Sequence, residues 1–132
     1  MGAIAEMTQQ GDVFSDGMDS VVIRREGASI IGGKTLDVTG FPDKFVRAGH
    51  IVIRETATDT FKPLGVSNGA YLTLPTGHTY EGVVKASKPV EQPFVSVMYE
   101  GEVNDIASPY PITDDIRTAL KSVLPGLYFK HD

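Results

Sequence analysis

The stretch that decides the fold reads Pro93-Phe-Val-Ser-Val-Met-Tyr-Glu-Gly-Glu-Val-Asn104. Its alternating apolar residues predict a strand that ends at Gly101, followed by a second, short extended piece. Pro109 and Pro111 then stiffen the chain ahead of a helix, because proline fixes φ and lacks an N–H. None of these residues forms a pattern of reactive chemistry, so this third of the chain indicates rigid architecture rather than catalysis.

A helix is predicted directly after these prolines. Thr113 is a suitable N-cap, and Asp114 and Asp115 favour the positive end of the helix dipole. Pro125-Gly126 predicts its end, and 127–129 are expected to return as a last extended segment. One apolar face is formed by residues at i, i+3, i+4 and i+7, namely Ile116, Ala119, Leu120 and Val123.

The rest of the chain is predicted to be extended, with turns at short intervals. Asn68-Gly69 is a strong hairpin signal, and Gly32-Gly33 ends an earlier extended run. The expected strands lie at 21–24, 34–39, 50–54, 61–64, 71–74, 80–86 and 94–99. The sequence therefore predicts a β-dominated α+β fold, a small β-barrel or sandwich-like domain with one late helix.

The first 20 residues differ from the rest in composition. They contain few large apolar side chains and no sustained periodicity, which is typical of a flexible N-terminal arm. The 132 residues fit one domain, so we expect an arm over 1–20 and a single β-rich domain over 21–132.

Charge and composition exclude several classes of function. The net charge is −5, and the basic residues are scattered, which argues against nucleic acid as a partner. The absence of cysteine excludes disulfide scaffolds, thiolate zinc sites and thiol catalysis. No apolar run is long enough for a membrane span, and the N-terminus lacks the basic and apolar regions of a secretory signal. We therefore expect neither a nucleic acid nor a membrane as partner.

No metal site or cofactor is indicated. His50, His78 and His131 each stand alone in a different expected turn or chain end, so we expect surface or turn histidines rather than ligands. Asp12, Asp16, Gly17 and Asp19 superficially resemble a calcium loop. Val13 and Phe14 break its register, however, and residues 20–24 supply no late carboxylate.

Two further motifs have a catalytic and a structural interpretation. Glu100 and Glu102 could form a general acid and base pair if one strand ran through both, but no nucleophile or cofactor loop accompanies them. A polar strand surface is the favoured interpretation. Gly32-Gly33-Lys34-Thr35 matches only the tail of a phosphate-binding loop and is interpreted as a turn.

An ordered series of short motifs resembles a known family. The series consists of Ala48-Gly-His-Ile-Val52, Lys62-Pro-Leu64, Gly77-His-Thr-Tyr-Glu-Gly-Val-Val84, Met98-Tyr-Glu-Gly-Glu-Val-Asn104, Ile116-Arg-Thr-Ala-Leu120 and Pro125-Gly-Leu-Tyr-Phe129. It resembles tailed-phage head fibre proteins and, more distantly, head decoration proteins of the phage lambda type. The resemblance covers residues 48–129, with 32–40 as an extension; the stretch before Gly32 matches nothing firmly.

This resemblance implies a virion structural protein, from a free phage or a prophage, that is not an enzyme and needs no cofactor. Such proteins are homotrimers that bind the major capsid protein on the outer shell and stabilise it. The chain would then be found on the capsid surface, and in the host cytoplasm during assembly. The resemblance implies structural roles for Gly49, Pro63, Leu64, Gly77, Gly82, Gly101, Glu102, Val103, Asn104, Leu120 and Gly126. It makes Asp12, Val13, Phe14 and Met18 of the arm candidate capsid contacts.

Two alternatives remain at this level. One is a displayed receptor- or glycan-binding module, for which Tyr71, Tyr80 and Tyr110 could offer stacking faces, although packing is the simpler role for them. The other, less favoured, is a small β-barrel enzyme with Glu100, Glu102 and Asp105 as acid and base.

Overall fold

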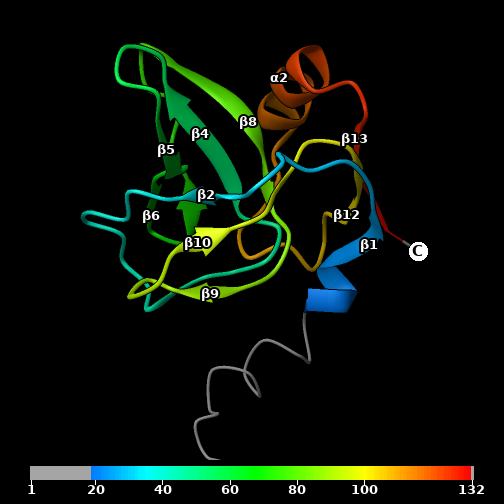
Figure 1. Cartoon of the computed structure of the whole chain (residues 1–132). Coiled ribbons are helices and arrows are strands. Elements are labelled where there is room, and N and C mark those ends of the chain that lie inside the picture. Colours follow the sequence, from blue (N-terminus) through cyan, green and yellow to red (C-terminus); the bar gives the residue numbers. More distant parts are fainter. Residues whose placement is uncertain (1–18, 132) are drawn as a thin grey trace, which may run out of the picture.

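The structure, a computed structural model, describes residues 19–131 (Figure 1). The arm residues expected to contact a capsid, Asp12, Val13, Phe14 and Met18, lie outside these described residues. The fold is β-dominated and contains a curled half-barrel sheet and one late helix, which confirms the predicted class.

The described chain begins with a helical turn at 19–22 and continues mostly through short strands. The strands are β1 (Ile23–Glu26), β2 (Lys34–Thr35), β3 (Phe45–Val46), β4 (Ile51–Glu55), β5 (Thr60–Pro63), β6 (Val66–Ser67), β7 (Ala70–Tyr71), β8 (His78–Val84), β9 (Lys88–Pro89), β10 (Phe94–Val95), β11 (Val97–Met98), β12 (Gly101–Asn104) and β13 (Leu127–Lys130). The helix is α2 (Asp114–Val123).

The central sheet is antiparallel and has the strand order β11-β8-β4-β5. Hydrophobic side chains cover both of its faces. Residues 51, 52 and 53 of β4 are all buried, and so are 83 and 84 of β8. A strand with two covered faces needs continuous rather than alternating apolar residues, which explains the β-branched run Ile51-Val-Ile53.

Two hydrophobic clusters lie against these faces. Ile51, Ile53 and Val83 belong to the first cluster, which also contains Leu120 of α2 and Leu127 of β13. Val52 and Val84, their neighbours in sequence, belong to the second cluster, with the partners Leu36, Val46, Phe61, Val95 and Val97. Successive residues of one strand therefore anchor the two clusters.

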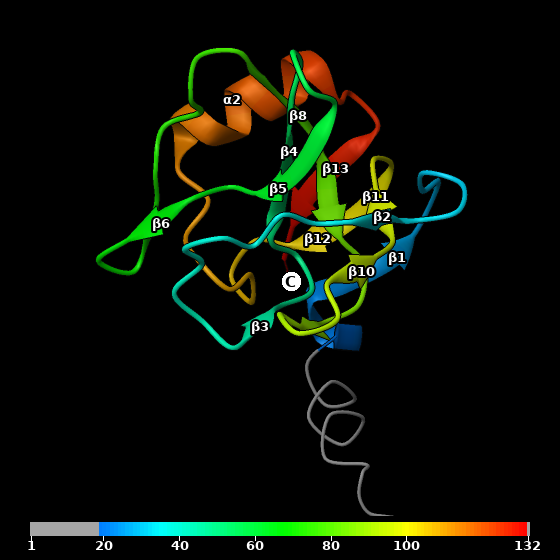
Figure 2. The same ribbon diagram turned by 60° about the vertical axis from the view of Figure 1, so that its left-hand side comes forward.

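The second sheet has the order β1-β12-β13 (Figure 2). β1 pairs with β12 in antiparallel fashion, whereas β12 and β13 are parallel, with Gly101 opposite Leu127 and Val103 opposite Phe129. Parallel neighbours need a long crossover connection, and the segment that contains α2 provides it. The extended pieces predicted around Gly101 and at 127–129 are thus adjacent strands.

Helix α2 forms as its capping residues predict. The Thr113 hydroxyl accepts a hydrogen bond from the Ile116 N–H at 3.3 Å, and the helix ends before Pro125 with Leu124 as its C-cap. Leu120 is fully buried, and Ile116 and Ala119 pack against the first cluster. Val123 is 52% exposed, so the predicted apolar face is wider than the face that is buried.

Four predicted strands differ from the observed ones. The strand expected at 94–99 is divided into β10 and β11, which pair with β2 and β8 respectively, and Gly101 begins β12 instead of ending a strand. Of the strand expected at 71–74, only Tyr71 lies in a strand, β7.

The strand expected at 21–24 begins only at Ile23, because residues 19–22 form a helical turn that buries Val22. The strand expected at 34–39 is limited to β2. Beyond it the Leu36 N–H bonds to Pro93 and the Asp37 N–H bonds to Phe61, so the backbone changes partners. Tertiary contacts override local strand preference in these two places.

A β-bulge adjusts the register of β8 to the first cluster. Val52 lies opposite Gly82 and Ile53 lies opposite Tyr80, so Glu81 is the extra residue. The bulge brings Tyr80 to the same cluster as Val83, three residues away. Gly82 has a φ of +153°, and a Cβ there would lie 2.4 Å from the Met98 carbonyl oxygen.

We expect Gly82→Ala to destabilise the protein much more than Gly77→Ala. Gly77 also has positive φ, at +80°, but a Cβ there would meet no atom within 4 Å. Gly77→Ala should lower the free energy of unfolding by about 1 kcal/mol through backbone strain alone. Gly82→Ala adds a backbone overlap and should cost about 3 kcal/mol or more. Urea unfolding measures both, and equal losses would contradict this account of the bulge.

Candidate functional site

The three carboxylates considered as acid and base candidates have different surroundings. Glu102 lies 3.8 Å from the Arg25 guanidinium on the neighbouring strand β1. Glu100 is exposed and precedes β12. Asp105 binds Arg117 of α2 and His131, both at 2.8 Å. Within residues 19–131, no group of three or more His, Cys, Asp and Glu is placed to hold a metal ion.

Asp105 fastens the end of the chain to the second sheet. Its backbone N–H bonds to the Lys130 carbonyl, and Arg117 also donates to the Phe129 carbonyl at 3.2 Å. Partial burial raises the pKa of Asp105, but the hydrogen bonds from Arg117 and His131 outweigh this and leave the pKa below its usual value. These contacts identify Asp105 as an anchor for β13.

His50 directly follows a turn, as expected, but it is buried, which corrects the expectation of a surface or turn histidine open to solvent. Its side chain is 1% exposed, and Nε2 lies 2.9 Å from the Leu64 carbonyl oxygen, to which its N–H donates. Nδ1 has no hydrogen-bond partner among the described residues. Burial lowers the pKa of His50 to about 4, although the Leu64 bond and the charge of Asp43 act in the opposite direction. The ring is therefore neutral at pH 7.

Three aromatic rings surround His50, each in an edge-on arrangement. The ring centroids of Phe41 and Tyr71 are both 5.2 Å away, and that of Tyr110 is 5.6 Å away. The Tyr71 hydroxyl accepts the Ile51 N–H at 3.2 Å, and burial raises the pKa of Tyr71. His50 therefore joins β4, β7, the loop before β3 and the proline segment before α2.

This packing removes the stacking faces proposed for a glycan site. Tyr71 and Tyr110 pack against His50 and each other, with 5.4 Å between their centroids, and Tyr80 is 6% exposed. The more exposed tyrosines are Tyr99 and Tyr128, at 42% and 40%. Tyr128 is flanked by Lys121 and Lys130, each within 6 Å of its ring.

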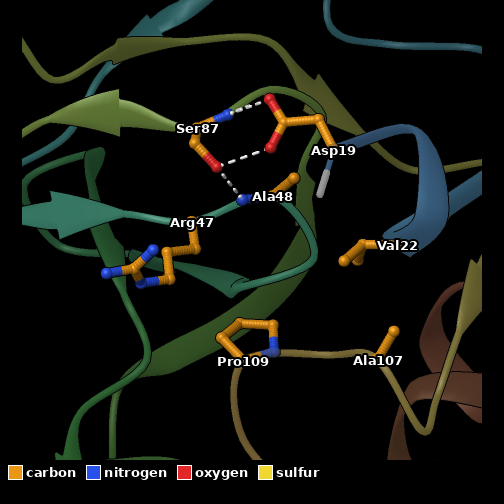
Figure 3. Close-up of a pocket in the computed structure, with 7 residues that line it drawn as sticks. All are labelled: Asp19, Val22, Arg47, Ala48, Ser87, Ala107 and Pro109. Carbon is orange, nitrogen blue, oxygen red and sulfur yellow. Dashed lines mark hydrogen bonds between the residues drawn. The ribbon is translucent and has the colours of Figure 1, made fainter. Parts of the chain in front are cut away.

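A pocket of about 210 Å³ lies where the described chain begins (Figure 3). Its apolar lining is Val22, Ala48, Ala107 and Pro109, and its polar lining is Asp19, Arg47 and Ser87. Arg47 forms an ion pair with Asp43 at 3.2 Å. The pocket is small and mostly apolar, so it suits a side chain better than a cofactor.

One wall of this pocket is a hydrogen-bonded clip made by Asp19 and Ser87. The Asp19 carboxylate accepts the Ser87 N–H at 2.9 Å and its hydroxyl at 2.7 Å, and the same hydroxyl accepts the Ala48 N–H at 2.8 Å. Figure 3 shows these three contacts side by side. Sequence reasoning placed Asp19 in the arm and missed the clip, because no spacing signal connects residues 68 positions apart.

The residues that carry the family resemblance occupy constrained positions. Leu64 and Val103 are 0% exposed and Leu120 is 1% exposed. Gly49, Gly77, Gly82 and Gly101 have positive φ, and a Cβ at Gly101 would lie 2.6 Å from the Arg25 carbonyl oxygen. Pro63 is buried in β5, and Asn104 accepts the N–H groups of Ile106 and Ala107. Gly126 lies against Glu100, where a Cβ would be 3.0 Å from that side chain.

Comparison with models of protein families, with curated proteins and with solved structures finds no match for this chain. No helix within residues 19–131 has the length and apolar character needed to span a membrane.

We expect His50 to make the protein less stable in acid. The His50 side chain takes up a proton near pH 6.5 in the unfolded chain but only near pH 4 in the folded chain. The free energy of unfolding should therefore fall as the pH is lowered from about 6.5 to about 4, by about 3 kcal/mol in all. Urea unfolding at a series of pH values measures this loss.

His50→Gln isolates this contribution, because glutamine can still donate to Leu64 but does not titrate. Its stability should change less with pH than that of the wild type between pH 6.5 and pH 4. Thr113→Ala, which removes the cap of α2 and changes no titratable group, serves as the control; it should lower stability at every pH and keep the wild-type slope. A His50→Gln protein with the full wild-type slope would show that another group titrates.

Proposed function

We propose that the chain is a phage virion structural protein, a head fibre or decoration protein that binds the outer capsid surface as a homotrimer. The proposal rests on the structural positions of the residues that carry the family resemblance. Most are positions at which the backbone or the core admits little else, such as Gly82 against Met98 and Val103 in the first cluster. The residues that carry the resemblance are thus placed where the structural roles that it implies would require them.

The surface also supports a protein partner. Ile31 is 98% exposed, Ile106 is 73% exposed and Phe94 is 56% exposed. These side chains are accessible to a protein partner. The polar candidates for chemistry are engaged elsewhere: Asp105 anchors the chain end, and Glu102 pairs with Arg25.

The N-terminal arm supplies the second part of the proposal. Residues 1–18 contain Glu6, Asp12 and Asp16 and no Lys or Arg, so a basic groove on the shell is a complementary partner. Three copies around one axis combine three modest contacts into a strong one. Because the protein binds the assembled shell, it stabilises that shell by mass action.

The proposal predicts a trimeric mass in solution and binding to shells assembled from the major capsid protein encoded beside this gene. Analytical ultracentrifugation measures the mass, and co-sedimentation with the shells measures the binding. A monomer that stays in the supernatant would contradict the proposal, as would a gene neighbourhood without capsid genes.

Deletion of residues 2–18 should weaken shell binding by roughly tenfold or more while the domain keeps its thermal stability. This deletion keeps Asp19 and the buried Val22, both of which belong to the folded domain. Raised salt should weaken the wild type more than the deletion variant, because the arm carries the carboxylates. Full binding by the deletion variant would exclude the arm from the contact.

A further inference from the structure

The first described residues, 19–22, make two different attachments to the rest of the domain. The first is the clip, in which both oxygens of Asp19 accept hydrogen bonds from Ser87. The second is apolar: Val22 is 4% exposed, and its Cγ1 would lie 2.5 Å from a Cβ at Gly49. Only Ser20 and Val21 separate them, and both are exposed. With the clip formed, the chain is attached from residue 19. Without the clip, it is attached only from residue 22.

The clip also connects the arm to the central sheet. Ser87 lies between β8 and β9, and its hydroxyl accepts the N–H of Ala48, which is 2% exposed just before β4. A second, more open hollow of about 530 Å³ is lined by Asp19 together with Lys85 and Lys88. Asp19 therefore lines both this hollow and the apolar pocket, where the arm begins.

We infer that Asp19 and Ser87 are positioning residues that fix the origin and direction of the arm for its contact with a capsid shell. The inference rests on the proposed function for the identity of that partner. The clip itself is a feature of the described residues. The clip keeps residues 19–21 ordered in the free protein, so that binding to the shell does not carry the entropy cost of ordering them.

The expected size of the effect follows from the entropy cost of ordering residues 19–21 on binding. Each residue that must be ordered again on binding lowers the affinity by roughly fivefold or more. These factors multiply, so loss of the clip should weaken shell binding by about fivefold where only Asp19 is released and by about a hundredfold where residues 19–21 are all released.

Ser87→Ala is the decisive variant, because it opens the clip without changing the sequence of the arm. The full chain is compared with Ser87→Ala and Ser87→Thr, which keeps a hydroxyl. Thr113→Ala is the matched control, since it removes one side-chain acceptor from the cap of α2. Figures 1 and 2 place α2 at the end of the domain opposite the helical turn at 19–22. The measurements are thermal unfolding, hydrogen exchange at Ala48, and affinity for the shells described above.

Ser87→Ala should accelerate exchange at Ala48 by tenfold or more and weaken shell binding by fivefold or more. Ser87→Thr should restore both, and Thr113→Ala should lose stability with unchanged affinity. Wild-type affinity in Ser87→Ala would overturn the inference and leave the proposed function intact. So would equal losses of affinity in Ser87→Ala and Thr113→Ala, or unchanged exchange at Ala48. Failure of the wild-type chain to bind shells would instead overturn the proposed function.

Discussion

The pairing of β4 with β8 inside two hydrophobic clusters is the constraint on which the rest of the structure depends. Ile51 and Ile53 face one cluster and Val52 faces the other, so a shift of β4 by one residue would exchange the two sets of partners. Helix α2 contributes Leu120 to the first cluster, and β10 contributes Val95 to the second. Most of the remaining strands have only two or four residues, and such short strands need this common support.

The glycines adapt the short strands to this sheet. Gly82 allows β8 to approach the Met98 backbone at the bulge, and Gly101 allows β12 to approach the Arg25 carbonyl of β1. At Gly49 the missing side chain leaves room for Val22, which fixes the start of the domain against the turn before β4. These glycines share one physical role, which is close approach of chain segments from different parts of the sequence. Close approach accounts for Gly49, Gly82 and Gly101, whereas Gly77 is required only by its positive φ.

The sequence predicts those features whose determinants are local. Helix α2 is correct because its cap, first-turn acids and terminating proline lie within one short segment, and the hairpin at Asn68-Gly69 is correct for the same reason. The parallel pairing of β12 with β13 is not encoded in either strand alone; it depends on the crossover between them. His50 is the clearest failure, because its burial requires Phe41, Tyr71 and Tyr110 to meet from three other segments. The residues next to a histidine that follows a turn do not show that aromatic rings from distant segments will pack around it.

The same distinction applies to the boundary between arm and domain. Composition separates a polar beginning from an apolar remainder, so it places the boundary near residue 20. Asp19 nevertheless belongs to the domain, because its carboxylate meets donors on Ser87 that lie far away in the sequence. A polar residue at a domain edge can be either a solvated linker residue or a hydrogen-bonded anchor, and only the fold distinguishes the two.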